Sequence, residues 1–560
     1  MAKKNKGAGN ALVQGSILAI ASIISRIIGL IYRIPMQNIL GDIGIGYYST
    51  AFEIYNVMLI ISSYSLPTAV SKMVSAQMAK KNRRQTYQIL KCALLFATTT
   101  GTIVALILFF GGEFFATTLL NTPFSIFALK VLAPTLLVVA ILGVLRGFFQ
   151  GLGTMMPSAV SQIIEQVVNA IVSVWAAYVL YRTGSRIGAI LGDKEHYAAA
   201  YGAAGGTLGT ALGAVAALIF VIFIYMIYMT LFKKQMKRER NVSVDSLGYT
   251  MKVLIVTVIP VLLSTTIYNI SSIIDQGVFK QVALLQGYSQ NDIDVWWGIY
   301  TGKFKLLINV PISIASAMAA SFVPVLTGSY ARRDMEDVRN QINLSTRFVM
   351  VVAFPCTVGL AVLATPIFNL LFNGTRQTND FASCMMWIGA VSVLFYAMST
   401  LSNGLLQGID RLKVPVINAA IALGAHVIVL VALMLFFRLN IYAVVLANAF
   451  FALLMCFLNS SALKKYSGFE QEIKKTFIIP AICSIFMGVA AFVIYFLLDH
   501  VFTMIGARIR NAIAFVIAFV VAVIVYAITL LLFKGLSEDE IRKFPKGMTI
   551  IRFAKKFHLL

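Results

Sequence analysis

The sequence predicts an all-α polytopic membrane protein, and its composition, its apolar segments and the placement of its charges each support that class. Hydrophobic residues make up 59% of the 560 residues and charged residues only 12%, which is more apolar side chain than one soluble core buries. The net charge is +24, but the basic residues fall in short loops between apolar segments and form no single face. This placement is typical of a membrane protein and argues against a nucleic-acid partner.

Fourteen apolar segments are long enough for a helix to cross a bilayer, which takes about 20 residues. In chain order they lie at roughly 12–36, 46–77, 88–111, 124–148, 155–182, 203–232, 250–280, 295–327, 345–372, 380–407, 413–437, 440–464, 474–498 and 507–534.

The basic residues test this division, because Lys and Arg collect in cytoplasmic loops. If the N-terminus is cytoplasmic, the inner segments hold thirty Lys and Arg and the outer segments hold seven. An even number of helices with both termini in the cytoplasm follows. The basic start and the first apolar segment resemble a signal peptide, but Arg26 interrupts that segment and no small-residue cleavage site is evident. We therefore predict a retained first helix.

An internal repeat predicts how the helices are grouped. The motif "RGFFQG" at 146–151 returns as "NGLLQG" at 403–408, an offset of 257 residues, and the same offset relates Pro67 to Pro324. Because six helices intervene, we predict two six-helix bundles of the same orientation, related by a pseudo-twofold axis along the membrane normal, with two more helices at the end. The predicted parts are an N-terminal lobe (1–240), a C-terminal lobe (241–466), two additional helices (467–535) and a cytoplasmic basic tail (536–560).

Charged residues inside the apolar segments are the candidate site residues, because an arginine at the bilayer centre costs about 2.5 to 3.5 kcal/mol. Arg26 and Arg33 are two helical turns apart and share one face of the first segment. Such a face could grip a diphosphate, since a guanidinium donates bidentate hydrogen bonds to phosphate and keeps its charge. Alternatively, Arg33 pairs with Glu53 and Arg26 with Asp275 as structural ion pairs. Both interpretations stay open at this point.

Other polar residues are weaker candidates. Lys303 and Lys305 lie roughly 200° apart on a helix, so at most one of them faces a cleft. Glu165 belongs to a polar stripe that either lines the substrate path or hydrogen-bonds to a neighbouring helix. Lys280 is interpreted as reaching toward the headgroups, and the loop residues Asp292 and Asp294 as solvated.

The remaining motifs exclude several kinds of site. The five cysteines contain no CxxC and the four histidines have no ligand spacing, so neither a metal site nor a disulfide framework is expected. The chain has no GxxxxGK[ST] motif, which excludes a P-loop for ATP. We expect no cofactor and no catalytic residue.

Several motifs together resemble a known family. They are "SRIIGLIYRIP", "GIGYYSTAFEIYNV", "SLPTAVSKMVSAQMAK", "RGFFQG", "PSAVSQIIEQ" and "YTGKFKLLINVPISIASAMAASFVPVLTGSYAR". In this order they resemble the polysaccharide-transport branch of the multidrug/oligosaccharidyl-lipid/polysaccharide exporter superfamily, and within it the stage V sporulation protein B and MurJ-like lipid II flippase groups. The resemblance implies a fourteen-helix, two-lobe flippase with a cationic central cavity. It implies that Arg26 and Arg33 contribute to that cavity, with Lys303 and Lys305 as counterparts of a basic residue in the eighth helix.

Three classes of function remain on the sequence alone. The first is a flippase that moves an undecaprenyl-diphosphate-linked oligosaccharide across the bacterial cytoplasmic membrane, with membrane lipids and other envelope-synthesis proteins as further partners. The second is a cation-coupled multidrug exporter of the same superfamily, although cationic drugs favour a cavity richer in acids. The third is a membrane-embedded enzyme of envelope synthesis, which would need clustered carboxylates or histidines at a membrane face. The sequence favours the flippase.

Overall fold

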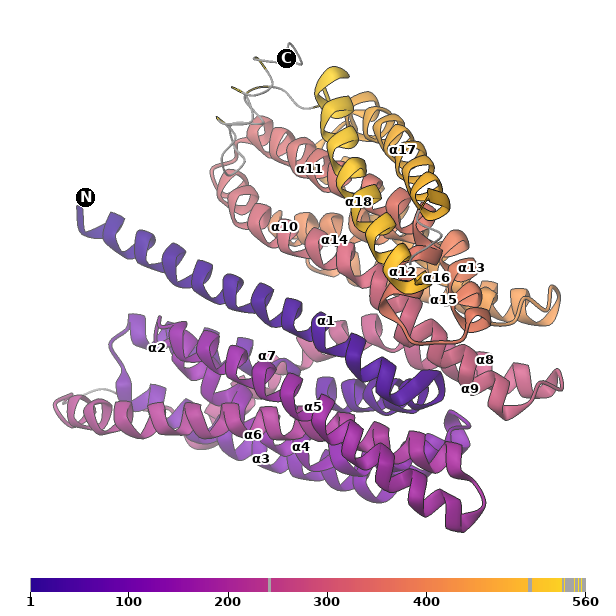
Figure 1. Ribbon diagram of the computed structural model, residues 1–560. Coiled ribbons are helices and arrows are strands. Elements are labelled where there is room, and N and C mark those ends of the chain that lie inside the picture. The colour runs from indigo at the N-terminus through magenta and orange to yellow at the C-terminus, as the bar shows by residue number, and fades with distance from the viewer. Residues whose placement is uncertain are drawn as a thin grey trace. The chain divides into compact units, whose positions relative to one another are not determined.

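The computed structural model describes residues 2–239, 243–501 and 506–535, together with Glu538, Met548, Arg552 and Lys555. Within these residues every regular element is a helix, joined by turns and loops, and none is a strand, as predicted (Figure 1). The predicted basic tail at 536–560 lies largely outside the described residues. The five cysteines are free, and none of them is exposed.

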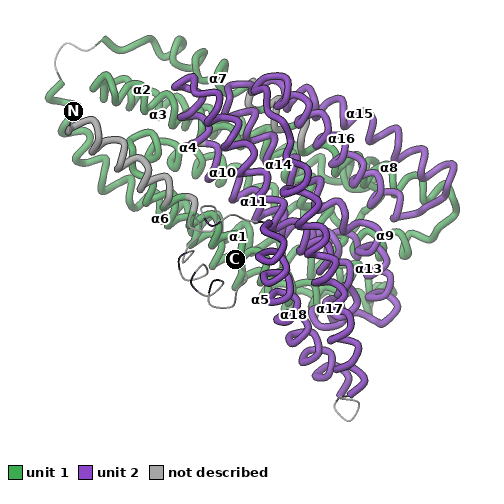
Figure 2. Tube along the Cα trace, turned by 90° about the horizontal axis from the view of Figure 1, so that it is seen from above, with its two compact units in different colours: residues 1–298 green, residues 299–560 purple. Residues whose placement is uncertain are grey.

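The chain forms two compact units, residues 1–298 and 299–560, which are coloured separately in Figure 2. The predicted lobes, in contrast, are defined by the repeat and divide at residue 240. A division by packing does not test a division by repeat, so the predicted lobe boundaries stay a prediction. Each unit is described by itself below.

The first unit contains nine α-helices and three short helices of other types among its described residues. They are α1 (Ala2–Leu59), η1 (Ile60–Tyr64), α2 (Leu66–Ala79), α3 (Arg83–Glu113), η2 (Phe114–Leu119), η3 (Pro123–Ser125), α4 (Ile126–Gly151), α5 (Met156–Leu191), α6 (Lys194–Lys237), α7 (Leu247–Asn269), α8 (Ser271–Leu285) and α9 (Gln290–Ile299).

The second unit contains the following helices in its described part. They are η4 (Tyr300–Phe304), α10 (Lys305–Ala331), α11 (Met335–Val362), α12 (Ala364–Leu371), α13 (Arg376–Gly389), α14 (Ser392–Gly408), α15 (Lys413–Leu435), α16 (Ile441–Ser467), η5 (Lys474–Ile478), α17 (Ile479–Val501) and α18 (Ala507–Leu532).

Eleven helical segments of the described chain are long and apolar enough to span a membrane, or up to twelve if the bent pair α13 and α14 forms one span. This number is near the predicted fourteen but does not confirm it. Part of the difference lies in the segment Ile20–Ala79, which runs through α1, η1 and α2 and counts as one span. Its 60 residues would extend about 90 Å as a straight helix, which is enough for two spans. A further apolar helix, Leu247–Ile259, is too short for the count.

Gly41 divides α1 into two parts. Its φ of 68° and ψ of −178° are not helical, and glycine adopts such angles without a Cβ clash. Figure 1 shows the chain turning back within the stretch labelled α1 and continuing into η1 and α2. The first two predicted spans therefore correspond to α1 before Gly41 and to the chain that follows it through α2.

The linker between α6 and α7 is fixed to the start of α3. Arg83 forms an ion pair with Glu239 at 2.6 Å, and the Gln85 side chain donates to Asp245 Oδ2 at 3.1 Å while accepting from the Asp245 amide at 2.9 Å. These bonds explain why α7 packs with the first unit.

Helices α17 and α18 pack on α11 and α12 of the second unit. The Tyr526 hydroxyl donates to the Val351 carbonyl at 2.7 Å, and the Asn511 side chain donates to the Pro366 carbonyl at 3.0 Å. Apolar clusters around Cys483 and Met487 continue the same interface. The two additional helices predicted from the sequence are thus anchored to the rest of their unit by polar as well as apolar contacts.

Candidate substrate-binding residues

Arg26 lies on an exposed side of α1 while the adjacent side of the same helix packs on α5. Ser22 Oγ donates to Gln162 Oε1 at 3.2 Å, Gly29 faces the Gln166 side chain, and the Tyr32 hydroxyl accepts from Asn169 at 3.3 Å. These partners are three, four or seven residues apart along each helix, so they lie on one face of each and form one polar seam. The seam fixes the rotation of α1, and with it the direction of Arg26, which is exposed.

Arg33 lies two turns further along α1 and is half-buried. Its guanidinium is beside the phenol groups of Tyr32 and Tyr48. Because the helix is unbroken between Arg26 and Arg33, the two arginines lie about 10.5 Å apart along its axis, as the sequence predicts. The structure therefore keeps both cations on one element, although only Arg26 is fully exposed on the surface of the unit.

Glu165 forms an ion pair with Arg146 of α4, with Oε2 and Nη2 2.8 Å apart. The Arg146 Nε also donates to Ser161 Oγ at 2.8 Å, so one guanidinium joins two residues of the α5 polar stripe. This is the interhelical hydrogen bonding that the sequence left open for Glu165. A contact between Glu165 and substrate stays a prediction.

Two predicted acids lie in the same unit as Arg26. Asp275 on α8 is buried, at 3% exposure, and Glu53 on α1 is partly buried. The alternative in which Arg26 pairs with Asp275 and Arg33 with Glu53 stays a prediction.

The two predicted lysines lie in the second unit, and they differ in burial. Lys303 is 1% exposed, and its Nζ donates to Asn379 Oδ1 at 3.2 Å and to Thr378 Oγ1 at 3.3 Å. Lys305 is partly exposed, with Nζ 5.9 Å from the centre of the Tyr300 ring. Lys303 is thus held by helix α13, and Lys305 is the more accessible of the two.

A cluster that the sequence analysis misinterpreted lies in the first unit. Lys280 and Asp294 form an ion pair at 2.6 Å with exposures of 0% and 2%. The expectation that Asp294 is solvated and that Lys280 reaches toward headgroups is therefore wrong. The two residues are 14 positions apart on different helices, and no pattern in the sequence signals that helices α8 and α9 fold together to bury them.

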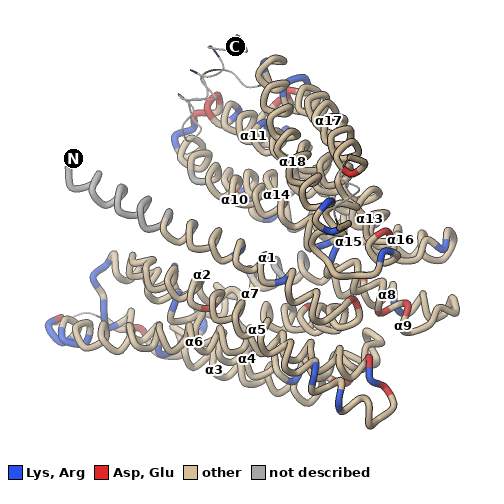
Figure 3. Tube along the Cα trace, in the orientation of Figure 1, with Lys and Arg blue, Asp and Glu red and all other residues tan. Residues whose placement is uncertain are grey.

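Most other basic residues lie where the sequence predicts them, between the apolar segments. Figure 3 shows Lys and Arg concentrated at helix ends and in connecting segments of both units. No group of three or more His, Cys, Asp or Glu within the described residues has a geometry that could hold a metal ion.

These features define a multi-pass membrane protein, and comparison with solved structures shows proteins with a similar fold. A structure of the lipid II flippase MurJ in an inward closed conformation aligns with a TM-score of 0.64 at 15% identity, covering 92% of this chain and 98% of that one. An inward-facing multidrug resistance MATE transporter of the MOP superfamily aligns with a TM-score of 0.62 at 15% identity, covering 82% and 99%.

The chain belongs to the polysaccharide biosynthesis protein family, whose model matches residues 12–330. It is 25% identical to the lipid II flippase MurJ of Bacillus subtilis over 517 residues, covering 90% of this chain and 92% of that protein. It is also 23% identical to stage V sporulation protein B of Bacillus subtilis over 553 residues, covering 97% and 100%. The family resemblance drawn from the motifs is confirmed.

Proposed function

We propose that the protein is a flippase that moves an undecaprenyl-diphosphate-linked oligosaccharide, lipid II or a related envelope precursor, across the bacterial cytoplasmic membrane by alternating access. The observation that carries this proposal is the similarity to a lipid II flippase over nine-tenths of both chains. The fold supports it, because alternating access needs two helical bodies that can move against each other. In this proposal both termini are cytoplasmic and the protein is a transporter rather than an enzyme.

The proposed ligand for the diphosphate is Arg26, assisted by Arg33 and by Lys303 or Lys305. Arg26 is supported by its exposure, since a guanidinium that is not buried among neighbouring helices is accessible to a ligand. A charge-assisted hydrogen bond contributes about 1.5 to 3 kcal/mol, so a bidentate contact would offset most of the cost of placing one arginine in the membrane.

A second candidate function is cation-coupled multidrug export, which the fold similarity to a MATE transporter supports. The charges of the described membrane helices favour the flippase. Arginines such as Arg26 and Arg33 attract an anionic diphosphate and repel a cationic drug.

Rescue of bacteria depleted of their own lipid II flippase tests the proposal. Cells expressing this chain should survive depletion and should present lipid II on the outer leaflet. The controls are an empty vector and a multidrug exporter of the same fold at equal membrane levels, neither of which should rescue. If the chain reaches normal membrane levels without rescue and instead raises efflux of a cationic dye, the multidrug function replaces the proposed one.

A further inference from the structure

A buried polar network connects four helices at one end of the first unit. Asp294 on α9 lies at its centre, because its Oδ1 pairs with Lys280 of α8 at 2.6 Å and accepts from the Gln290 side chain at 3.2 Å. Lys280 also donates to Thr122 Oγ1 at 3.3 Å. The network continues from the other carboxylate oxygen, as Tyr47 of α1 donates to Oδ2 at 3.3 Å.

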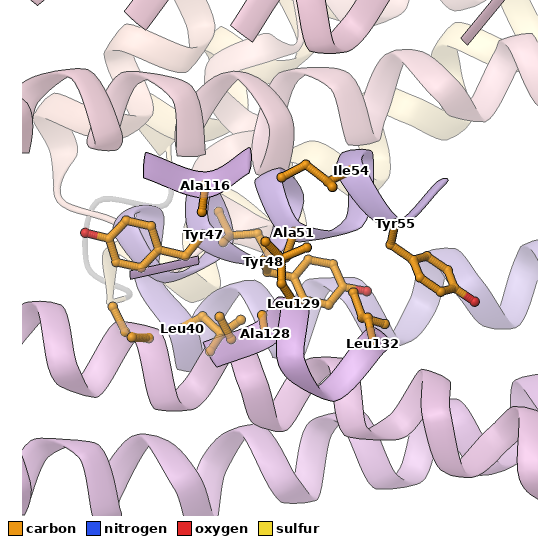
Figure 4. Close-up of a cluster of buried hydrophobic side chains, with 14 of the residues drawn as sticks. Leu40, Tyr47, Tyr48, Ala51, Ile54, Tyr55, Ala116, Ala128, Leu129 and Leu132 are labelled. Carbon is orange, nitrogen blue, oxygen red and sulfur yellow. The ribbon is translucent and has the colours of Figure 1, made fainter. Parts of the chain in front are cut away.

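His196 is the outermost member of this network. Its Nδ1 lies 2.6 Å from the Tyr47 hydroxyl, and its ring stacks on Phe124 with centroids 5.4 Å apart. His196 is partly exposed, whereas Tyr47, Lys280 and Asp294 are each at most 2% exposed. Figure 4 shows the Tyr47 hydroxyl at the edge of the apolar cluster, pointing away from Leu129 and Leu132. A proton from solvent can therefore reach the network at His196.

The network joins α8 and α9 to the turn of α1. Gly298 packs so closely on this turn that a Cβ at its position would lie 1.7 Å from the Asp42 carbonyl oxygen. Gly46 lies against the Asp294 backbone, and the Gln276 side chain donates to Thr50 Oγ1 at 2.5 Å. Residues 271–298 are thus docked on α1 by close backbone packing with a polar network at its edge.

Whether His196 Nδ1 carries a hydrogen decides where the Tyr47 hydrogen goes. The hydroxyl has one hydrogen and two acceptors within reach, Asp294 Oδ2 and, when it carries no proton, His196 Nδ1. A protonated imidazole donates from Nδ1, so Tyr47 must then donate to Asp294. Protonation therefore completes a chain of hydrogen bonds from His196 through Tyr47 to Asp294 and Lys280.

Several charged groups lie around this network. Asp193 accepts from the His196 amide at 3.2 Å, and Asp193 and Glu195 on α6 are both near enough to Tyr47 to interact with it electrostatically. With Asp294 they make three carboxylates, against one cation of the network, Lys280. Asp42 on α1 is engaged by the Gln37 side chain at 2.9 Å.

We infer that His196 is a proton-binding site, and that binding of a proton there strengthens the docking of α8 and α9 on α1. Histidine suits this role because it changes charge between about pH 5 and pH 8. The inference does not depend on the identity of the transported molecule. It gives the protein a means of coupling proton concentration to the movement of residues 271–298.

Distance measurements between two spin labels test the inference. We place cysteines at Ile190 and Leu285, both 86% exposed, in a chain whose five native cysteines are replaced by alanine. The purified protein in nanodiscs should give a short, narrow distance at about pH 5.5. At about pH 8 a component at longer distance should grow at the expense of the short one.

Three substitutions identify the responsible group. His196→Gln and Tyr47→Phe should each abolish the pH response, since one removes the titrating ring and the other the link to Asp294. Neither breaks the Lys280–Asp294 ion pair, so both proteins should fold. His500→Gln, at an exposed histidine on α17, is the matched control and should respond as the parent does.

Two results would overturn the inference. One is a parent protein whose distance distribution is the same at both pH values. The other is a response that survives in His196→Gln. If Tyr47→Phe alone keeps the response, the proton acts through charge at His196 and the proposed hydrogen-bond chain is wrong.

Discussion

Gly147 of α4 lies directly on the backbone of Pro67 in α2, so that a Cβ at position 147 would be 2.5 Å from the Pro67 carbonyl oxygen. In the second unit Gly404 of α14 packs on Val323 of α10, where a Cβ would be 3.1 Å from a side-chain methyl group. The two contacts are related by the 257-residue repeat, because Val323 precedes the counterpart of Pro67. In each unit a glycine of the repeated motif therefore allows two helices to approach closely, and the two helix pairs are equivalent by the repeat.

Gly147→Ala should destabilise the protein more than Gly404→Ala. At position 147 the new methyl group meets backbone, which cannot move without shifting α2, and overpacking of this kind costs about 1 to 3 kcal/mol. At position 404 it meets one valine methyl group at 3.1 Å, which needs to shift by only a few tenths of an ångström. Thermal unfolding followed by loss of monodisperse protein measures the difference. Equal melting temperatures for the two variants would contradict the close contact at Pro67.

Removal of Lys280 alone should be strongly destabilising, and removal of both partners much less so. Lys280→Met leaves Asp294 as a buried charge without its cation, which costs about 3 to 5 kcal/mol. The double variant Lys280→Met with Asp294→Leu replaces the pair by apolar groups of similar size, and such replacements are often neutral or stabilising. A double-mutant cycle on melting temperature checks this. Additive effects of the two single changes would show that the residues are not paired.

Arg26→Ala should abolish transport without a loss of stability, because the side chain is exposed and substitutions at such positions usually change stability by less than about 0.5 kcal/mol. Arg26→Lys should keep part of the activity, since the charge remains while the bidentate fork is lost. The matched control is Arg146→Ala, a loss of an arginine that is paired within the structure. It breaks the ion pair with Glu165 and, unlike Arg26→Ala, should lower the melting temperature.

Two outcomes would remove Arg26 from the proposed site. One is normal transport by Arg26→Ala at normal membrane levels. The other is recovery of a failing Arg26→Ala protein when Asp275→Ala is added, because that result would make the arginine a structural partner of Asp275.

Cysteine labelling tests the predicted topology. A cysteine at Lys80 should react only from the cytoplasmic side, and one at Arg376 only from outside. Both positions are exposed, whereas the neighbouring Asn82 is buried and caps α3 by accepting from the Gln85 amide at 2.9 Å. Labelling of both cysteines by an impermeant reagent from the same side would contradict an arrangement in which the two positions lie on opposite faces of the membrane.

The sequence by itself determined the class of the protein, its helical secondary structure and its family. Helix-length apolar segments such as Lys413–Leu435 have few alternatives in a bilayer, because each must satisfy its own backbone hydrogen bonds. The 257-residue repeat marked the segments around Gly147 and Gly404 as equivalent, but not the contacts that these glycines make. Arg26 and Arg33 were visible as candidates because a cation within an apolar segment is costly.

Only the tertiary structure decided which charges are buried together. Lys280 and Asp294 are separated by a turn that resembles a solvated loop, and their burial depends on α8 and α9 folding against α1 and η3. The same holds for His196 and Tyr47, which lie 149 residues apart in the chain and 2.6 Å apart in space. Helix formation is local and leaves its mark on neighbouring residues, whereas an ion pair between helices depends on how those helices pack, and no short stretch of sequence records that.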